Sequence, residues 1–311
     1  MRRLEIAFWL VPVAAFFLFP GYLVLGSQVL IAALFALSLD LILGYAGIVS
    51  LGHAAFFGIG AYTAGLLSVH GWGEPLTGLA AAAAVAALAG FAVSFLVVRG
   101  EDLARLMVTL GVGLLLYEAA NRAAPVTGGV DGLSGVAMWK LLGVFAFDLN
   151  GRTAYVYSFA VLAAVFVLVR RLVRSPFGLE LRGIRENARR MPALGVPVER
   201  RLVAAFTVAA AIAGVAGALL AQTTQFVGLD TLGFNRSAEL VIMVVLGGAG
   251  RLYGAIIGTA VFMIAQDYLS GINPVYWQFW LGLLLVAIVF FARGGILGAL
   301  GALAARGGRR P

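Results

Sequence analysis

The chain has no cysteine, and its 311 residues include only two histidines, His53 and His70. The missing thiols exclude disulfides, thiolate catalysis and cysteine-based metal sites. Two histidines are too few for a metal-binding cluster, and no Ser-His-Asp arrangement stands out. The sequence also lacks the G-x-x-x-x-G-K-[ST] loop that cradles nucleotide phosphates. We therefore expect neither an enzyme nor a bound cofactor, and any ATP hydrolysis that drives this chain must occur on another subunit.

Charge is scarce as well. Charged residues make up 12% of the chain and hydrophobic residues 62%, with a mean hydropathy of +1.01. Ordinary soluble domains carry about 25% charged residues. These values predict an all-α, polytopic helical membrane protein. The net charge of +8 does not indicate nucleic-acid binding, because the arginines cluster beside apolar runs and at the C-terminus, as in membrane-proximal loops.

About eight to ten membrane segments are expected, since a spanning helix needs about 20 apolar residues. Two of them, residues 53–70 and 238–250, are short, and the sequence leaves open whether they cross or re-enter. The candidate segments are residues 6–25, 28–49, 53–70, 77–98, 103–121, 154–173, 202–222, 238–250, 254–270 and 276–293.

The basic residues predict the orientation. Arginines at the N-terminus (Arg2, Arg3), in residues 174–201 and at the C-terminus (Arg306, Arg309, Arg310) indicate that both termini are cytoplasmic. An even number of crossings follows. The loop over residues 122–152 then faces outward. With no soluble domain or linker in view, residues 1–311 are expected to form a single transmembrane domain.

Glycine-interrupted segments occur in both halves of the chain. The first is GYAGIVSLGHAAFFGIGAYTAG and the second is VIMVVLGGAGRLYGAIIGTAVF. Paired short or glycine-broken segments suggest repeated halves with the pathway between them. Close packing of helices is the alternative explanation for any single glycine.

The most basic stretch lies between two apolar runs, at residues 170–201. It holds nine arginines against three acids, and Pro176 and Pro197 bound its central part. The pattern predicts a short amphipathic helix over about residues 177–190, ended by Pro192, and then a turn near Gly195. On pattern alone, an interfacial helix anchored on anionic lipid and a docking helix for a cytoplasmic protein are equally good interpretations.

Four motifs in order resemble the permeases of branched-chain amino acid ABC importers, specifically the M-type subunit. They are LDLILGYAGIVSLGHAAFFGIGAYTAG, TGGVDGLSGV, RGIRENARRMPALGVPVERRLVAAFTVAAAIAGVAGAL and ELVIMVVLGGAGRLYGAIIG, and they extend the resemblance over about residues 28–293.

The resemblance implies a membrane subunit that works by alternating access. Its expected partners are a second permease paralogue, two cytoplasmic ATPase subunits and an extracytoplasmic substrate-binding protein, within membrane lipid. The implied cargo is branched-chain amino acids or related small polar solutes. The residues that the resemblance assigns to ATPase coupling are Phe177, Gly178, Leu181, Arg182, Ile184, Arg185, Glu186, Asn187, Arg189 and Gly195.

A few polar residues in apolar or outer segments are further candidates. Asp40, Ser50 and His53 are candidates for the translocation pathway, although Asp40 could equally link helices and His53 could simply pack. Asp131 and Ser134 could contact a binding protein or form a turn. Asp267 and Glu239 lie near span ends and are expected to be solvated.

The alternative function is a stand-alone secondary transporter for a small solute. It would need a coupling-ion site, and Asp40 is the one good intramembrane carboxylate for it.

Overall fold

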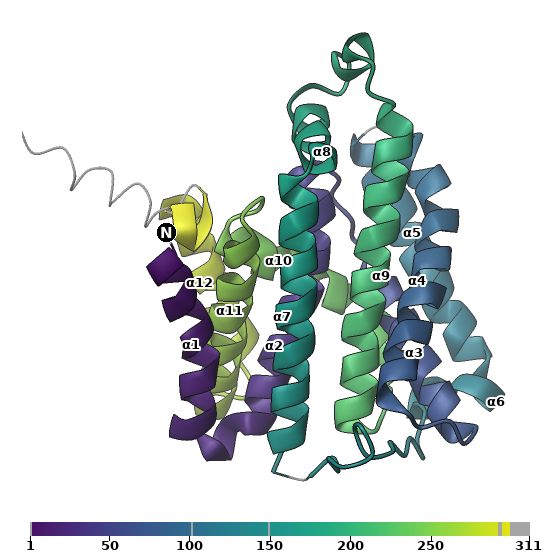
Figure 1. Ribbon diagram of the computed structural model, residues 1–311, viewed down its shortest axis with the longest axis vertical. Coiled ribbons are helices and arrows are strands. Elements are labelled where there is room, and N and C mark those ends of the chain that lie inside the picture. Colours follow the sequence, from purple (N-terminus) through teal and green to yellow (C-terminus); the bar gives the residue numbers. More distant parts are fainter. Residues whose placement is uncertain (1, 101, 149, 292–293, 299–311) are drawn as a thin grey trace, which may run out of the picture.

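The computed structural model describes residues 2–100, 102–148, 150–291 and 294–298, and these residues form a helical bundle (Figure 1). The helices are α1 (Arg2–Leu18), η1 (Pro20–Tyr22), α2 (Leu23–Asp40), η2 (Leu41–Tyr45), α3 (Ala54–Val69), α4 (Pro75–Val98), α5 (Asp102–Arg122), α6 (Ala124–Thr127), η3 (Gly129–Asp131), α7 (Arg152–Arg174), α8 (Pro176–Asn187), η4 (Met191–Leu194), α9 (Val198–Thr224), η5 (Leu229–Leu232), α10 (Phe234–Gly247), α11 (Leu252–Ile272) and α12 (Trp277–Phe291).

The polytopic helical fold is confirmed. Most predicted segments coincide with one helix each, but residues 6–25 run from α1 through η1 into α2, which begins at Leu23. Within the described residues, six helices are long and apolar enough to cross a membrane: Pro20–Tyr45, Pro75–Val98, Leu103–Arg122, Arg152–Arg174, Val198–Thr224 and Leu252–Ile272. The predicted short segments are short in the structure too. At about 1.5 Å per residue, the 14 residues of α10 reach about 21 Å, less than a hydrocarbon core of about 30 Å.

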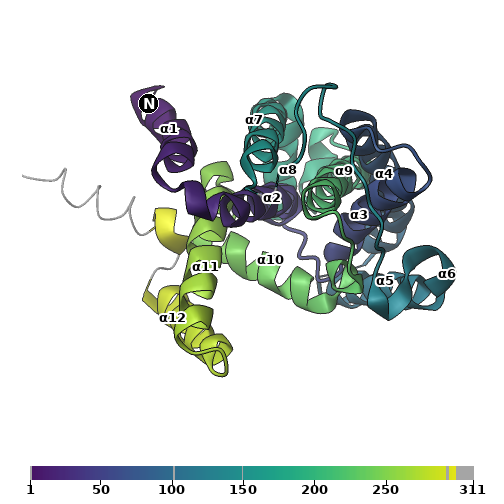
Figure 2. The ribbon, with the colours of Figure 1, turned by 90° about the horizontal axis from the view of Figure 1, so that it is seen from below.

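Helices α2 and α9 occupy the centre of the bundle. Seen along its length, α3, α4 and α5 lie on one side of this pair, α1, α11 and α12 on the other, and α7 packs beside α2 (Figure 2). Most of the buried hydrophobic side chains form one cluster around α2 and α9. Among the six candidate spans in the described residues, the two that contain α2 and α9 have the largest buried shares, 61% and 67%.

Small residues bring α3 and α9 into direct backbone contact. A Cβ at Gly60 would strike the backbone of Gly214, and one at Gly217 would strike the carbonyl of Phe57. Since lipid is as apolar as leucine, close packing of this kind is what holds membrane helices together. Here the close-packing explanation of glycine is the right one.

The two short helices, α3 and α10, begin beside each other inside the bundle. The Ala54 amide donates to Ser237 Oγ at 2.9 Å, joining the first turns of both helices. Irregular chain leads into each one, at residues 46–53 and at residues 225–233, where the short 3-10 turn η5 interrupts it. Helix α10 lies obliquely across the bundle, so it is seen lengthwise where α7 and α9 are seen nearly end-on (Figure 2). With 16 and 14 residues, α3 and α10 are both shorter than the six candidate spans.

Both ends of the described chain lie at the end of the bundle that carries α8. Glu5 pairs with Arg170 in the last turns of α7 at 2.6 Å, and Gly294 and Gly295 contact Gly248. The predicted even number of crossings agrees with this arrangement. Arg306, Arg309 and Arg310 lie outside the described residues.

The α3–α9 contact predicts a stability difference between two glycines. Gly217→Ala should destabilise the fold by about 1–3 kcal/mol, because the new methyl group meets the Phe57 carbonyl. Gly111→Ala on α5 is the control, since its Cβ enters open space. Thermal unfolding of the purified protein in detergent measures both. Equal unfolding midpoints would contradict the close contact.

Candidate functional site

The amphipathic helix predicted from the basic stretch is α8, and it packs against the end of α7. Ser175 is extended and Pro176 opens the helix, a position where a missing N–H costs nothing. A Cβ at Gly178 would overlap the backbone of Val173. Gly178, Leu181 and Ile184 are buried, whereas Glu186, Asn187 and Arg189 are exposed. The helix therefore turns its apolar side to the protein and its polar side outward.

Arg185 attaches α8 to the first glycine-rich segment. Its Nη1 donates to the carbonyl oxygen of Gly44, in the π-helical turn η2 that ends α2. The backbone of Gly47, at φ +75°, passes the Arg185 side chain so closely that a Cβ would lie 3.1 Å from its Cγ. The guanidinium of Arg182, one turn away, lies 5.1 Å from the centre of the Tyr45 ring. Two arginines of α8, Arg182 and Arg185, thus contact the segment 44–47.

Asp40 attaches the same turn to the second glycine-rich segment. Its Oδ1 accepts from the Gly250 amide at 2.6 Å, across 210 residues of sequence. A side chain at Gly44 would collide with both Asp40 and Gly250. Arg185 also reaches Gly250, since its Nη1 would lie 2.9 Å from a Cβ there. We call this contact of Asp40, Gly44, Arg185 and Gly250 the glycine junction.

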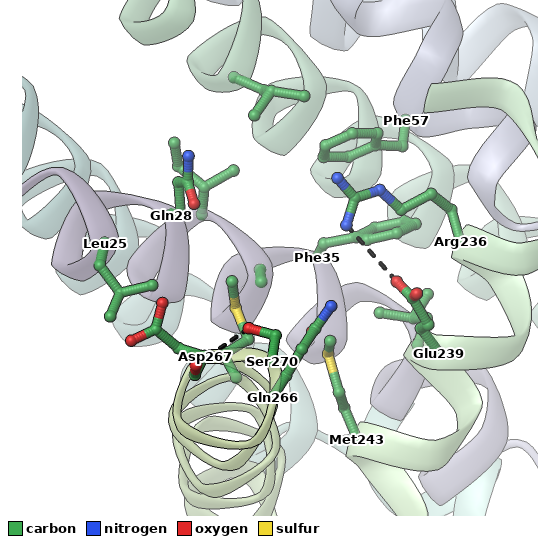
Figure 3. A pocket seen from close by; sticks show the side chains of 15 residues that line it. Leu25, Gln28, Phe35, Phe57, Arg236, Glu239, Met243, Gln266, Asp267 and Ser270 are labelled. Carbon is green, nitrogen blue, oxygen red and sulfur yellow. Dashed lines mark hydrogen bonds and ion pairs between the residues drawn. The ribbon is translucent and has the colours of Figure 1, made fainter. Parts of the chain in front are cut away.

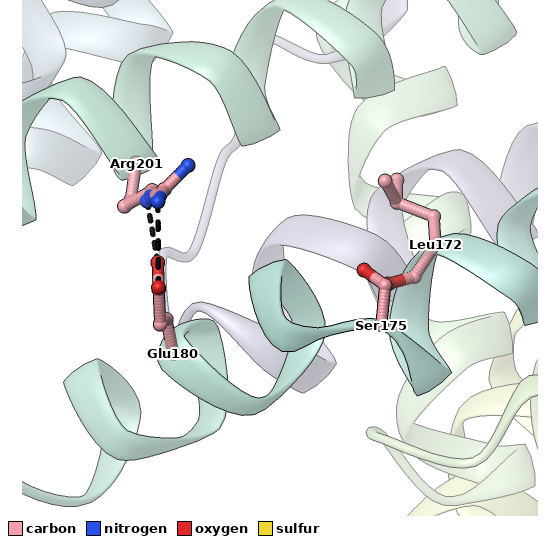
Figure 4. A network of polar contacts seen from close by, with 4 residues as sticks. All are labelled: Leu172, Ser175, Glu180 and Arg201. Atoms are coloured by element: carbon pink, nitrogen blue, oxygen red, sulfur yellow. Dashed lines mark hydrogen bonds and ion pairs between the residues drawn. The ribbon is translucent and has the colours of Figure 1, made fainter.

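A second set of contacts fixes α8 to α9. Glu180 and Arg201 form an ion pair, drawn in Figure 4 with the Ser175 hydroxyl that donates to the Leu172 carbonyl at 2.6 Å. The Arg201 guanidinium also lies 5.8 Å from the Phe177 ring centre. Helix α8 is thereby held by α7, α9 and the glycine junction together.

The helix ends earlier than predicted. It stops at Asn187, whose side chain accepts from the Arg190 amide at 3.1 Å and so offers the backbone an alternative to the helix. Pro192 lies in the 3-10 turn η4, and Gly195 follows at φ +80°, as expected for the turn. Ala188, the residue after the helix, is exposed. Leu194 projects from the tip with 75% of its surface exposed.

The three candidate pathway residues are all buried in protein. Asp40, Ser50 and His53 each have 0% exposure. His53 contacts Ser38 Oγ through Nε2 at 2.9 Å and stacks on Phe35. Asp40 has the linking role that the sequence left open. A part in the pathway stays a prediction for these residues.

A cavity lies elsewhere, between α2, α3, α10 and α11. It encloses about 280 Å³ and is lined by Phe35, Phe57, Arg236, Glu239 and Asp267 among others (Figure 3). Glu239 was expected to be solvated, but it is half-buried in this wall and pairs with Arg236 at 3.5 Å. The two short apolar segments of the sequence were a hint of this cavity, because the helices that they form, α3 and α10, both begin beside it.

Comparison with known proteins decides the family. Residues 22–289 match the family described as the permease component of branched-chain amino acid transport systems. The high-affinity branched-chain amino acid permease protein LivM of Salmonella typhimurium is 30% identical over 305 residues, which cover 89% of this chain and 70% of the relative. LivH of Escherichia coli K12 is 24% identical, covering 86% and 91%, and BraD of Pseudomonas aeruginosa is 25% identical with the same coverage.

The chain belongs to this permease family. It is a permease subunit of an ABC importer and a multi-pass inner-membrane protein, not an enzyme. No solved structure shows a significant match. The family's glycine-rich segments and basic loop, far apart in the sequence, meet in this permease at the glycine junction.

The junction makes a prediction about Asp40. Asp40→Leu should lower the free energy of unfolding by about 1–3 kcal/mol, because the partly buried Gly250 amide loses its acceptor. Asp40→Asn is the matched control, since its amide oxygen can still accept. Thermal unfolding in detergent distinguishes the two variants. If Asp40→Leu unfolds like wild type, the hydrogen bond is not a structural link.

Proposed function

We propose that this permease imports branched-chain or similar aliphatic amino acids, driven through α8 by a cytoplasmic ATPase. The glycine junction carries the proposal. One exposed basic helix is fastened to both glycine-rich segments, through Arg185 to Gly44 and, next to it, through Asp40 to Gly250. A push on α8 therefore reaches the end of α2 and the loop between α10 and α11 at the same time.

Alternating access follows from where those elements lead. In α2, α10 and α11, the halves farther from α8 line the cavity, and the ends nearer to α8 meet the glycine junction. Displacing the near ends tilts the helices that form the cavity walls. ATP-driven movement of α8 would then open the path to one side of the membrane and close it to the other.

The exposed surface of α8 and η4 suits a protein partner. Glu186, Arg189 and Arg190 offer charge, and Leu179 and Leu194 are 62% and 75% exposed. Apolar anchors inside a charged rim are typical of protein interfaces. We assign this surface to one of two ATPase subunits.

The remaining partners lie elsewhere on the molecule. Asp131 and Ser134 are exposed at the end opposite α8, where an extracytoplasmic substrate-binding protein would dock. Relatives named both LivM and LivH favour a heterodimer with a second permease paralogue. Apolar side chains exposed on α4 and α5, such as Leu88, Leu96 and Leu115, fit contact with lipid.

Reversing charge on the exposed side of α8 tests the docking surface. Glu186→Arg with Arg189→Glu should reduce co-purified ATPase and ATP-dependent leucine uptake by about tenfold or more, in line with the loss of about 1.4 kcal/mol or more of binding energy. Arg152→Glu, at the opposite end of α7, is the control. Normal assembly and uptake in the double variant would refute the assignment. Uptake driven by an ion gradient without the ATPase would instead favour a secondary transporter.

The absence of cysteine allows a direct test of orientation. A membrane-impermeant maleimide added to intact cells should label Ser134→Cys, whereas Ala193→Cys in η4 should react only after the membrane is opened. Both positions are exposed, so accessibility of the side chain does not bias the comparison. The reverse pattern would place α8 outside and exclude ATPase docking.

A further inference from the structure

We propose that the cavity between α2, α3, α10 and α11 is the transit site for the amino acid, binding it as a zwitterion. Arg236 binds the carboxylate, Asp267 binds the ammonium group, and Phe35 with Phe57 receives the aliphatic side chain. The inference rests on the proposed function and names where in this chain the cargo is recognised.

Opposite charges face this cavity from different helices. Arg236 and Glu239 come from the first turns of α10, and Asp267 comes from α11 with Gln266 and Ser270 beside it. Figure 3 shows Arg236 and Asp267 on opposite sides, with Phe35 between them. A free α-amino acid carries one charge of each sign, so this arrangement matches both of its charged groups.

Arg236 can accept a ligand without a large rearrangement. Its Nη1 meets Glu239 at 3.5 Å, the long limit of a hydrogen bond. A guanidinium has five N–H donors, and a carboxylate can take two of them side by side. Glu239 balances the arginine charge when the cavity is empty. The positive N-terminal end of α10 adds attraction for the same carboxylate.

The floor of the cavity is apolar and enclosed. Phe35 and Phe57 lie with ring centres 4.5 Å apart, and Phe35 is only 5% exposed, whereas Asp267 at the rim is exposed. A volume of about 280 Å³ is close to the lower end of small-molecule sites, about 300–1,000 Å³. The cavity therefore fits a small ligand that places its polar end at the rim and its hydrocarbon end inside.

The helix arrangement is that of a transport site. Helices α3 and α10 both begin at the cavity, held together by the bond from the Ala54 amide to Ser237 Oγ. Transporters commonly bind their cargo where two discontinuous helices meet near the membrane midplane. Phe35 and Asp40 lie on the same helix, α2, so the cavity floor is mechanically continuous with the glycine junction.

Protection from labelling tests occupancy without requiring transport. In the assembled complex, a Ser270→Cys variant is exposed to maleimide with leucine, 4-methylpentanoate or 3-methylbutylamine present. We expect protection by leucine and little by the acid or the amine, each of which carries one of the two charges. Adding Asp267→Asn should weaken the protection by leucine by about tenfold. The Ser134→Cys variant, far from the cavity, is the control for non-specific effects.

Two results would overturn the proposal. One is the absence of leucine protection at any concentration, and the other is equal protection by leucine and its two single-charge analogues. Protection by leucine without ATP-driven uptake would leave the site standing and refute the proposed function. The two failures are therefore distinguishable.

A size-selectivity experiment adds a readout that a purely structural role would not change. Ala32 lines the cavity and is half-buried, so Ala32→Leu should fill part of it. We expect uptake of leucine to fall about tenfold relative to alanine, with ATP hydrolysis stimulated by the binding protein unchanged. An unchanged leucine-to-alanine ratio would place the transit site outside this cavity.

Discussion

The rest of the structure depends on the close passage of two glycine turns at the end of α2. Gly44 and Gly250 approach so closely that a side chain at Gly44 would collide with the Gly250 backbone. The backbone groups exposed there must find partners inside the protein, because unsatisfied N–H and C=O groups are costly in a membrane. Asp40 accepts from the Gly250 amide, and Arg185 donates to the Gly44 carbonyl. The buried carboxylate of Asp40 thus has a structural reason to lie in an apolar bundle, and the guanidinium of the exposed Arg185 beside the junction partly compensates its charge.

This constraint links the two glycine-rich segments of the chain through several contacts at once. Polar contacts between membrane helices are each worth only about 0.6–1.7 kcal/mol, so no single bond could transmit a strong push. At the junction, however, several contacts act on the same few residues. They are the two hydrogen bonds, the Arg182–Tyr45 contact and the close backbone approach that leaves no room for a side chain at the glycines. Sliding α8 against α2 would break them together. The ion pair between Glu180 and Arg201 adds α9 to the same body.

Hydropathy and charge in the sequence were enough to predict most of the helices, but not that residues 6–25 hold most of α1, the turn η1 and the start of α2. Local chemistry also predicted α8 and the turn at Gly195. The contacts between distant segments were beyond sequence reasoning. Nothing local shows that Asp40 accepts from Gly250, because that bond joins positions 210 residues apart. Glu239 was misjudged for a similar reason: its neighbourhood on α10 looks like a solvated span end, and the enclosing walls come from α2 and α11. Helix α8 ends at Asn187, before Pro192, because the Asn187 side chain accepts a hydrogen bond from the Arg190 amide. Such a bond competes only weakly with helix formation in any sequence, so the sequence did not show where the helix would end.

The structure also separates the two explanations of the basic helix that the sequence left equal. An interfacial helix anchors by burying its apolar side among lipid headgroups. In α8 that side is already used, since Leu181 is 0% and Ile184 is 4% exposed, both within the protein core. What remains outward is charged, with Leu179 and the tip residue Leu194 as isolated apolar points. Its two exposed leucines are separated by the turn after Asn187. This arrangement favours docking to a protein, whose shaped surface can receive both leucines and the charges around them.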